Sequence, residues 1–137
     1  MTLAILYAVT FAVFLGLDYL GLSYIVKPTF EKEIKPLLHD SPRLGPAVMF
    51  YAFYVAVLLW FVSWPALQDN QPLIWVFGSG VLIGAMAYGT YEFTNLATIK
   101  GWTWRMVMTD FIWGSLLTGT AATAGVFAIR SFAPASP

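Results

Sequence analysis

The fold of this chain is decided by residues 73–99, which read LIWVFGSGVLIGAMAYGTYEFTNLATI and carry a single charged side chain, Glu92. A helix needs about 20 apolar residues to cross the hydrocarbon core of a bilayer. Three other stretches reach that length, so the sequence predicts four transmembrane helices. They cover residues 3–26, 46–67, 73–99 and 104–129, and the tail at residues 133–137 is expected to be disordered.

The composition of the whole chain favours the same fold class. Apolar residues make up 59% of the 137 residues, and charged residues only 10%. Soluble domains carry roughly 25% charge, so this chain has too few polar side chains to cover a water-soluble globule. We therefore expect one all-α domain, a four-helix transmembrane bundle. The seven basic and seven acidic residues balance, which disfavours nucleic-acid binding, and the absence of cysteine excludes disulfides and thiolate sites.

The basic residues predict the orientation of the bundle. Six of the seven lie in the first and third connections, at one end of the predicted bundle. The positive-inside rule makes that end cytoplasmic and places both termini outside. The chain is thus expected to be a multi-pass protein of a bacterial inner membrane with periplasmic termini. The six residues are Lys27, Lys32, Lys35, Arg43, Lys100 and Arg105.

The first cytoplasmic loop contains an amphipathic pattern. Phe30, Ile34, Leu37 and Leu38 recur at helical spacing, with charged residues on the other faces. This pattern predicts a short helix at the membrane interface that breaks near Pro36. A solvated connector is the alternative interpretation.

Three acids lie inside the predicted spans, and they share one depth. Asp18, Glu92 and Asp110 each lie eight or nine residues from the cytoplasmic end of their helix. At 1.5 Å of rise per residue, each carboxyl group is expected ~12 Å inside that end. The polar residues nearest this level are Tyr51, Tyr54, Tyr88 and Asn95.

Small residues share a helix face with two of these acids. At a spacing of four residues they allow helix backbones to approach closely in lipid. A charge inside the membrane costs about 2.5–3.5 kcal/mol, so the acids are expected to point into the bundle. The two columns are Gly80, Gly84, Tyr88 and Glu92, and Asp110, Gly114, Thr118 and Ala122.

The acid cluster has three interpretations. No lysine, arginine or histidine lies at its depth, so three ionised carboxylates would be strongly unfavourable there. Either some are protonated and share hydrogen bonds with the nearby tyrosines and Asn95, or a cation is bound. The cluster could therefore be structural hydrogen-bonding glue, a site for a ligand, proton or cation, or a catalytic site.

Several motifs carry a family resemblance. They are FYAFYV at residues 50–55, YEFTNLAT at residues 91–98, Gly101-Trp102, Asp110 with Trp113-Gly114, and the Lys27-Pro28 step. Together they resemble a family of small bacterial membrane proteins catalogued as domain of unknown function 2177. The family usually has aspartate where this chain has Glu92, which is one methylene longer. The resemblance covers nearly the whole chain and implies a four-helix inner-membrane protein, but it implies no activity.

The favoured function is a non-catalytic membrane module, either an accessory subunit of a larger membrane complex or a binder of a lipophilic ligand. The chain has no soluble domain and no catalytic motif, so no catalytic residue is assigned. The alternative is a proton- or cation-coupled carrier, or a membrane-embedded enzyme, that uses the carboxyl cluster.

The sequence also constrains ligands and partners. No cofactor or metal ion is predicted, although a bound lipid or quinone is compatible with the favoured function. The only histidine is His39 in the first loop, which excludes histidine-ligated haem or chlorophyll within the spans. Expected partners are membrane lipids and a larger membrane-protein complex. Homo-oligomerisation through the small-residue faces is a further alternative.

Overall fold

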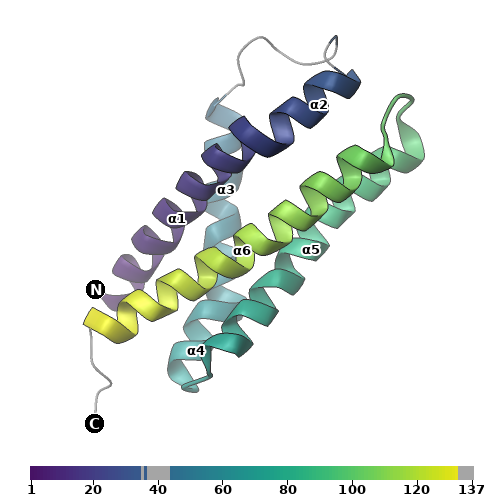
Figure 1. Cartoon of the computed structure of the whole chain (residues 1–137). Helices are drawn as coiled ribbons and strands as arrows, with labels where there is room; N and C mark the ends of the chain where they lie inside the picture. Colours follow the sequence, from purple (N-terminus) through teal and green to yellow (C-terminus); the bar gives the residue numbers. More distant parts are fainter. Residues whose placement is uncertain (35, 37–43, 133–137) are drawn as a thin grey trace.

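The computed structural model describes residues 1–34, 36 and 44–132, and four long helices account for most of them (Figure 1). The first comprises α1 (Thr2–Gly21), the π-helical turn η1 (Leu22–Val26) and α2 (Lys27–Ile34). The second comprises α3 (Leu44–Leu58), the π-helical turn η3 (Leu59–Ser63) and α4 (Trp64–Gln68). The third is α5 (Leu73–Thr98), and the fourth is α6 (Trp104–Phe132). Each is long and apolar enough to cross a membrane, which confirms the predicted fold class.

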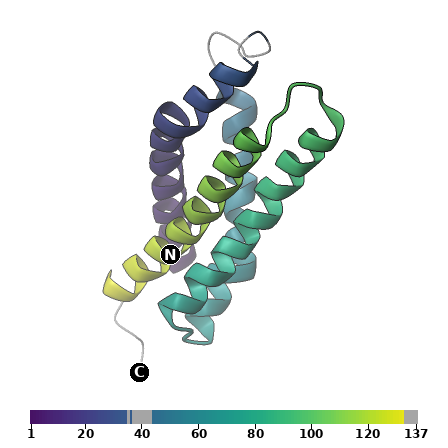
Figure 2. The same cartoon turned by 45° about the vertical axis from the view of Figure 1, so that its right-hand side comes forward.

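The helices form a bundle in which α1 begins and α6 ends at the same end (Figure 1). The α2 helix and the connection from α5 to α6 lie at the other end (Figure 2). Helix α6 is the most enclosed, with 56% of its most apolar segment buried, against 17–33% for the other spans. It packs against both α1 and α5 and so forms the centre of the bundle.

Both π-helical turns come shortly before a proline, Pro28 or Pro65. A proline inside a helix has no N–H to donate, and its ring clashes with the carbonyl group four residues earlier. Each π turn widens the helix ahead of the ring, and the N–H groups of Lys27 and Trp64 bond the carbonyl groups five residues earlier. The helices therefore continue through both prolines.

The continuation through Pro28 changes the first span. The sequence placed its end at residue 26, whereas the helix runs on to Ile34. The amphipathic segment with Phe30 and Ile34 is thus α2, joined to the first span without a break. The expectations for Leu37, Leu38, His39 and the tail at 133–137 lie outside the described residues.

Helices α5 and α6 approach closely through glycines. A Cβ atom at Gly80 would lie 2.8 Å from the Cα atom of Gly119, and one at Gly84 would lie 2.8 Å from the carbonyl oxygen of Gly114. Such distances leave no room for a side chain. The predicted small-residue columns therefore face each other in this hairpin.

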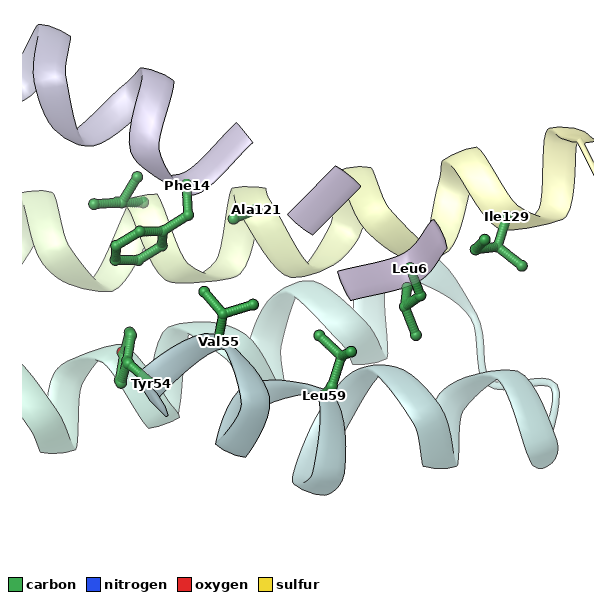
Figure 3. Packing of buried hydrophobic residues seen from close by; sticks show 8 residues of the cluster. Leu6, Phe14, Tyr54, Val55, Leu59, Ala121 and Ile129 are labelled. Carbon is green, nitrogen blue, oxygen red and sulfur yellow. The ribbon is translucent and has the colours of Figure 1, made fainter. Parts of the chain in front are cut away.

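The apolar core lies between α1, the second span and α6 (Figure 3). Towards the α2 end, the core includes the rings of Phe14 and Tyr54, whose centroids are 5.5 Å apart in an edge-on arrangement. Tyr54 also lines the cavity described below. The core side chains drawn in Figure 3 include Leu6, Phe14, Tyr54, Val55, Leu59, Ala121 and Ile129.

Arg130 lies at the opposite end of the bundle from the four other basic residues that the structure describes, and it has a local role there. One of its guanidinium nitrogens donates to the carbonyl oxygen of Ala66 at 3.3 Å and to that of Gln71 at 2.5 Å. These carbonyl groups lie in α4 and in the turn after it, and the Ala66 oxygen also accepts from the backbone N–H of Gln71 at 2.9 Å. Arg130 thus ties α6 to the connection between α4 and α5.

Candidate functional site

A cavity of about 640 Å³ lies at the α2 end of the bundle. Small-molecule sites in proteins are commonly about 300–1,000 Å³, so the space is large enough for a ligand. Its walls come from all four long helices. The structure brings together here six of the seven residues that the sequence singled out: Asp18, Tyr51, Tyr54, Tyr88, Glu92 and Asp110.

Glu92 and Asp110 form the deepest polar pair of this cavity. The Glu92 side chain is fully buried, and its Oε1 atom accepts a hydrogen bond from the indole N–H of Trp102 at 3.0 Å. The carboxyl group of Asp110 lies within hydrogen-bond reach of that of Glu92. Two carboxyl groups can share a hydrogen bond only when one of them carries a proton. A bond between these two groups would link α5 to α6 only while one of them is protonated.

Asp18 occupies the wall that α1 contributes. Its carboxyl group lies within hydrogen-bond reach of the Tyr51 hydroxyl on α3. Tyr54, one turn further along α3, instead bonds the hydroxyl of Thr118 on α6 at 2.9 Å. Thr118 in turn donates to the carbonyl oxygen of Gly114 at 2.8 Å. Tyr51 therefore belongs to the acid cluster, whereas Tyr54 is fixed by packing partners.

Two buried polar atoms of the cavity residues lack a hydrogen-bonding partner. Among the residues that the structure describes, no donor reaches the Oε2 atom of Glu92, and nothing bonds the hydroxyl of Tyr88. Buried polar atoms are nearly always paired, so each such exception needs an explanation. Both residues line the cavity, which makes a ligand or ordered water the natural partner.

Asn95 is the predicted site residue that does not line the cavity. It lies one turn from Glu92 towards the end of α5, within hydrogen-bond reach of Tyr91.

The structure also bears on the hypothesis that the acid cluster binds a cation. Within residues 1–34, 36 and 44–132, no group of three acidic or histidine side chains is arranged to hold a metal ion. The three acids share a cavity without converging on one point.

Trp102 is a site residue that the sequence reasoning treated only as a marker of the membrane interface. Its indole bonds Glu92, and its ring meets Phe30 and Tyr91 edge-on, with centroids 5.4 and 5.9 Å away. Gly101 has a φ of +86°, a conformation that glycine adopts without strain, and this turn returns Trp102 to Glu92. The Gly101-Trp102 motif was the sequence feature that could have identified Trp102 as a site residue.

The mouth of the cavity carries an ion pair that the sequence did not reveal as part of the site. The Nζ atom of Lys27 lies 3.7 Å from the Oε1 atom of Glu31, one turn along α2. Both side chains line the cavity and are about half exposed. Among the described residues, Lys27 is the only basic one in the lining, against four acidic ones. The cavity is therefore rich in acceptors.

The family model described as predicted membrane protein, DUF2177, matches residues 3–127 of this chain. The match covers most of the sequence, so the chain belongs to this family, as the motifs indicated. No curated protein and no solved structure matches the chain.

Proposed function

We propose that this protein is a non-catalytic membrane module that binds a lipophilic ligand in the cavity between its four helices. The observation that carries the proposal is the fully buried Glu92, whose Oε2 atom receives no hydrogen bond from any described residue. Glu92 is one of the residues that line a space of about 640 Å³ whose lining is mostly apolar. A few polar groups in an apolar concave site are typical of small-molecule binding sites.

A purely structural role, in which the polar side chains only hold the helices together by hydrogen bonds, explains the cavity less well. Carboxyl, hydroxyl and amide groups that only hold helices together are expected to satisfy one another. The bonds from Trp102 to Glu92 and from Tyr54 to Thr118 fit that role. The unpaired hydroxyl of Tyr88, a residue of the cavity lining, does not fit it.

A second candidate function is a proton- or cation-coupled carrier. The observation that favours it is the Glu92–Asp110 pair, two neighbouring carboxyl groups in the cavity lining. Asp18 on the opposite wall is a second carboxyl group on the same cavity. A carrier would move a proton between these groups as the bundle changes conformation. A membrane-embedded enzyme would additionally need a substrate bound beside one of the acids.

Native mass spectrometry tests the proposed function. We expect protein extracted in mild detergent to retain one small amphiphilic molecule at a fixed ratio. In the Ala87→Phe variant this molecule should be lost, because Ala87 lines the cavity and a benzyl group would fill part of it. The matched control is Ala97→Phe, on an exposed face of α5 outside the cavity lining, which should retain the molecule.

Two results would contradict the proposal. If the wild-type protein carries no small molecule, the ligand hypothesis is wrong. If it instead co-purifies with other proteins in a fixed ratio, the chain is an accessory subunit, and the carboxyl groups are better explained by packing. A second copy of the chain in that ratio would indicate a homo-oligomer.

The orientation in the membrane forms part of the proposal, which places the chain in a bacterial inner membrane with both termini in the periplasm. Of the basic residues that the structure describes, four lie at the α2 end. These are Lys27, Lys32, Lys100 and Arg105, and this bias favours a cytoplasmic location for that end. Arg130, at the other end, is held by backbone carbonyl groups.

Single cysteines test this orientation directly, because the natural chain has none. In intact cells, a membrane-impermeant maleimide should label Asp69→Cys, which follows α4. It should label Lys100→Cys, which follows α5, only after the cells are permeabilised. The reverse pattern would show that the termini are cytoplasmic.

A further inference from the structure

An apolar groove lies beside the cavity, between the α3 helix and α5, with a volume of about 270 Å³. Its walls are formed by Phe53, Val57 and Phe61 on the second span and by Ile83 and Met86 on α5. Helix α5 packs along α6, whereas its contacts with the second span are fewer and involve η3. This looser packing leaves the groove open.

The groove and the cavity meet at Tyr54 and Ala87, which line both. Phe53, Phe61 and Met86 are each more than 60% exposed, and in a bilayer their surroundings are lipid chains. The groove therefore opens to the hydrocarbon region of the membrane and adjoins the cavity at these two shared residues. A ligand that uses both spaces needs an apolar chain for the groove and a polar head for the cavity.

The charged side chains around the cavity determine which polar head group of a ligand can bind there. Asp18, Glu92 and Asp110 offer acceptors, and Oε2 of Glu92 has no donor among the described residues. Lys27, the one basic side chain that the described part of the chain contributes to the lining, lies 3.7 Å from Glu31 at the mouth. A phosphate or carboxylate head would be repelled by these groups, whereas an ammonium head can donate up to three hydrogen bonds to them.

We infer that the ligand is a single-chain amphiphile whose amine head binds in the cavity that Asp18, Glu92 and Asp110 make acidic, while its chain lies in the groove between α3 and α5. The inference rests on the proposed function and adds the charge of the head and the location of the chain. The amine replaces the missing donor at Glu92, and the chain covers the exposed aromatic and methionine side chains of the groove.

Three photoreactive probes test this inference on the wild-type protein in phosphatidylcholine nanodiscs. They share one alkyl chain with a diazirine at its middle and differ only in the head: a primary amine, an alcohol or a carboxylate. After irradiation, mass spectrometry locates the label. We expect the amine probe to label Phe53, Val57 and Met86 about tenfold more than the carboxylate probe does, and unlabelled alkylamine to compete. Phe127, an exposed side chain of α6 outside the groove, reports non-specific labelling from the bilayer.

The outcomes separate the inference from the proposed function. If the alcohol or carboxylate probe labels the groove as strongly as the amine does, the amine head is wrong, and a neutral or anionic ligand remains within the proposed function. If native mass spectrometry finds a bound molecule but no probe labels the groove above the Phe127 reference, the location of the chain is wrong. If both experiments are negative, the inference and the proposed function fail together.

Discussion

Valine in place of Gly84 should separate α5 from α6 and lower the free energy of unfolding by about 3 kcal/mol, since overpacking a tight contact forces the backbone to move. A Cβ atom at this position would lie 2.8 Å from the carbonyl oxygen of Gly114 and 2.9 Å from the Cα atom of Ser115. Both are backbone atoms, which cannot rotate away as a side chain does. Close packing is a main source of helix association in lipid, so the hairpin has no substitute for this contact.

Gly78→Val is the matched control for that variant. Gly78 lies on the same helix, and a Cβ atom there would meet no other atom within 4 Å. The Gly78→Val variant should have a free energy of unfolding within about 0.5 kcal/mol of that of the wild type, as is usual for surface substitutions. The measurement is an unfolding titration with sodium dodecyl sulfate in mild detergent. Equal midpoints for the two variants would show that the close approach of α5 and α6 contributes little to stability.

The spans were predictable because lipid imposes a simple constraint. Every backbone polar group in the hydrocarbon core must be paired within the segment, so long apolar stretches become helices. The fixed rise of a helix then related positions on different spans, and the three acids, predicted at one depth, line one cavity. The glycine columns predicted the contact between α5 and α6 for the same reason, since their spacing depends only on helical periodicity.

The π-helical turns could not be read from the sequence. Pro28 and Pro65 signal the end or the kink of a helix equally well, and only the packing around each decides whether the chain widens and continues. The bond from Trp102 to Glu92 depends on the turn at Gly101, a tertiary feature that no periodicity reports. The cavity is equally hidden, because its volume is what the core leaves unfilled.

Asn95 is a residue that the sequence predicted for the site but that the structure leaves outside the cavity lining. The sequence placed it near the acids because it lies on the same side of α5 as Glu92 and within one turn of it. In the structure that turn is enough to take it out of the cavity lining and beside Tyr91. Depth and face were thus sufficient to identify the region of the site, but not to distinguish a lining residue from its neighbour.

Replacing Glu92 with alanine should lower the free energy of unfolding by about 3 kcal/mol, because it leaves buried partners unpaired. The Trp102 indole N–H would lose its acceptor at 3.0 Å, and Asp110 would lose the neighbouring carboxyl group on α5. The Glu92→Gln/Asp110→Asn double variant should instead stay within about 1 kcal/mol of the wild type, since the amides retain an acceptor for Trp102 and can bond each other. Unfolding titrations compare the two variants.

The double variant separates structure from function, because it keeps the hydrogen bonds and removes the acidic groups. With neutral amides at both positions, labelling of the groove by the amine probe should fall about tenfold, which corresponds to about 1.4 kcal/mol of binding free energy. Glu31→Gln, at the half-exposed mouth, is the control and should change labelling by less than about threefold, since solvent-exposed charges interact weakly. Undiminished labelling in a folded double variant would mean that the Glu92–Asp110 pair only holds α5 against α6. A selective loss would mean that the same two carboxyl groups both hold the helices together and bind the ligand.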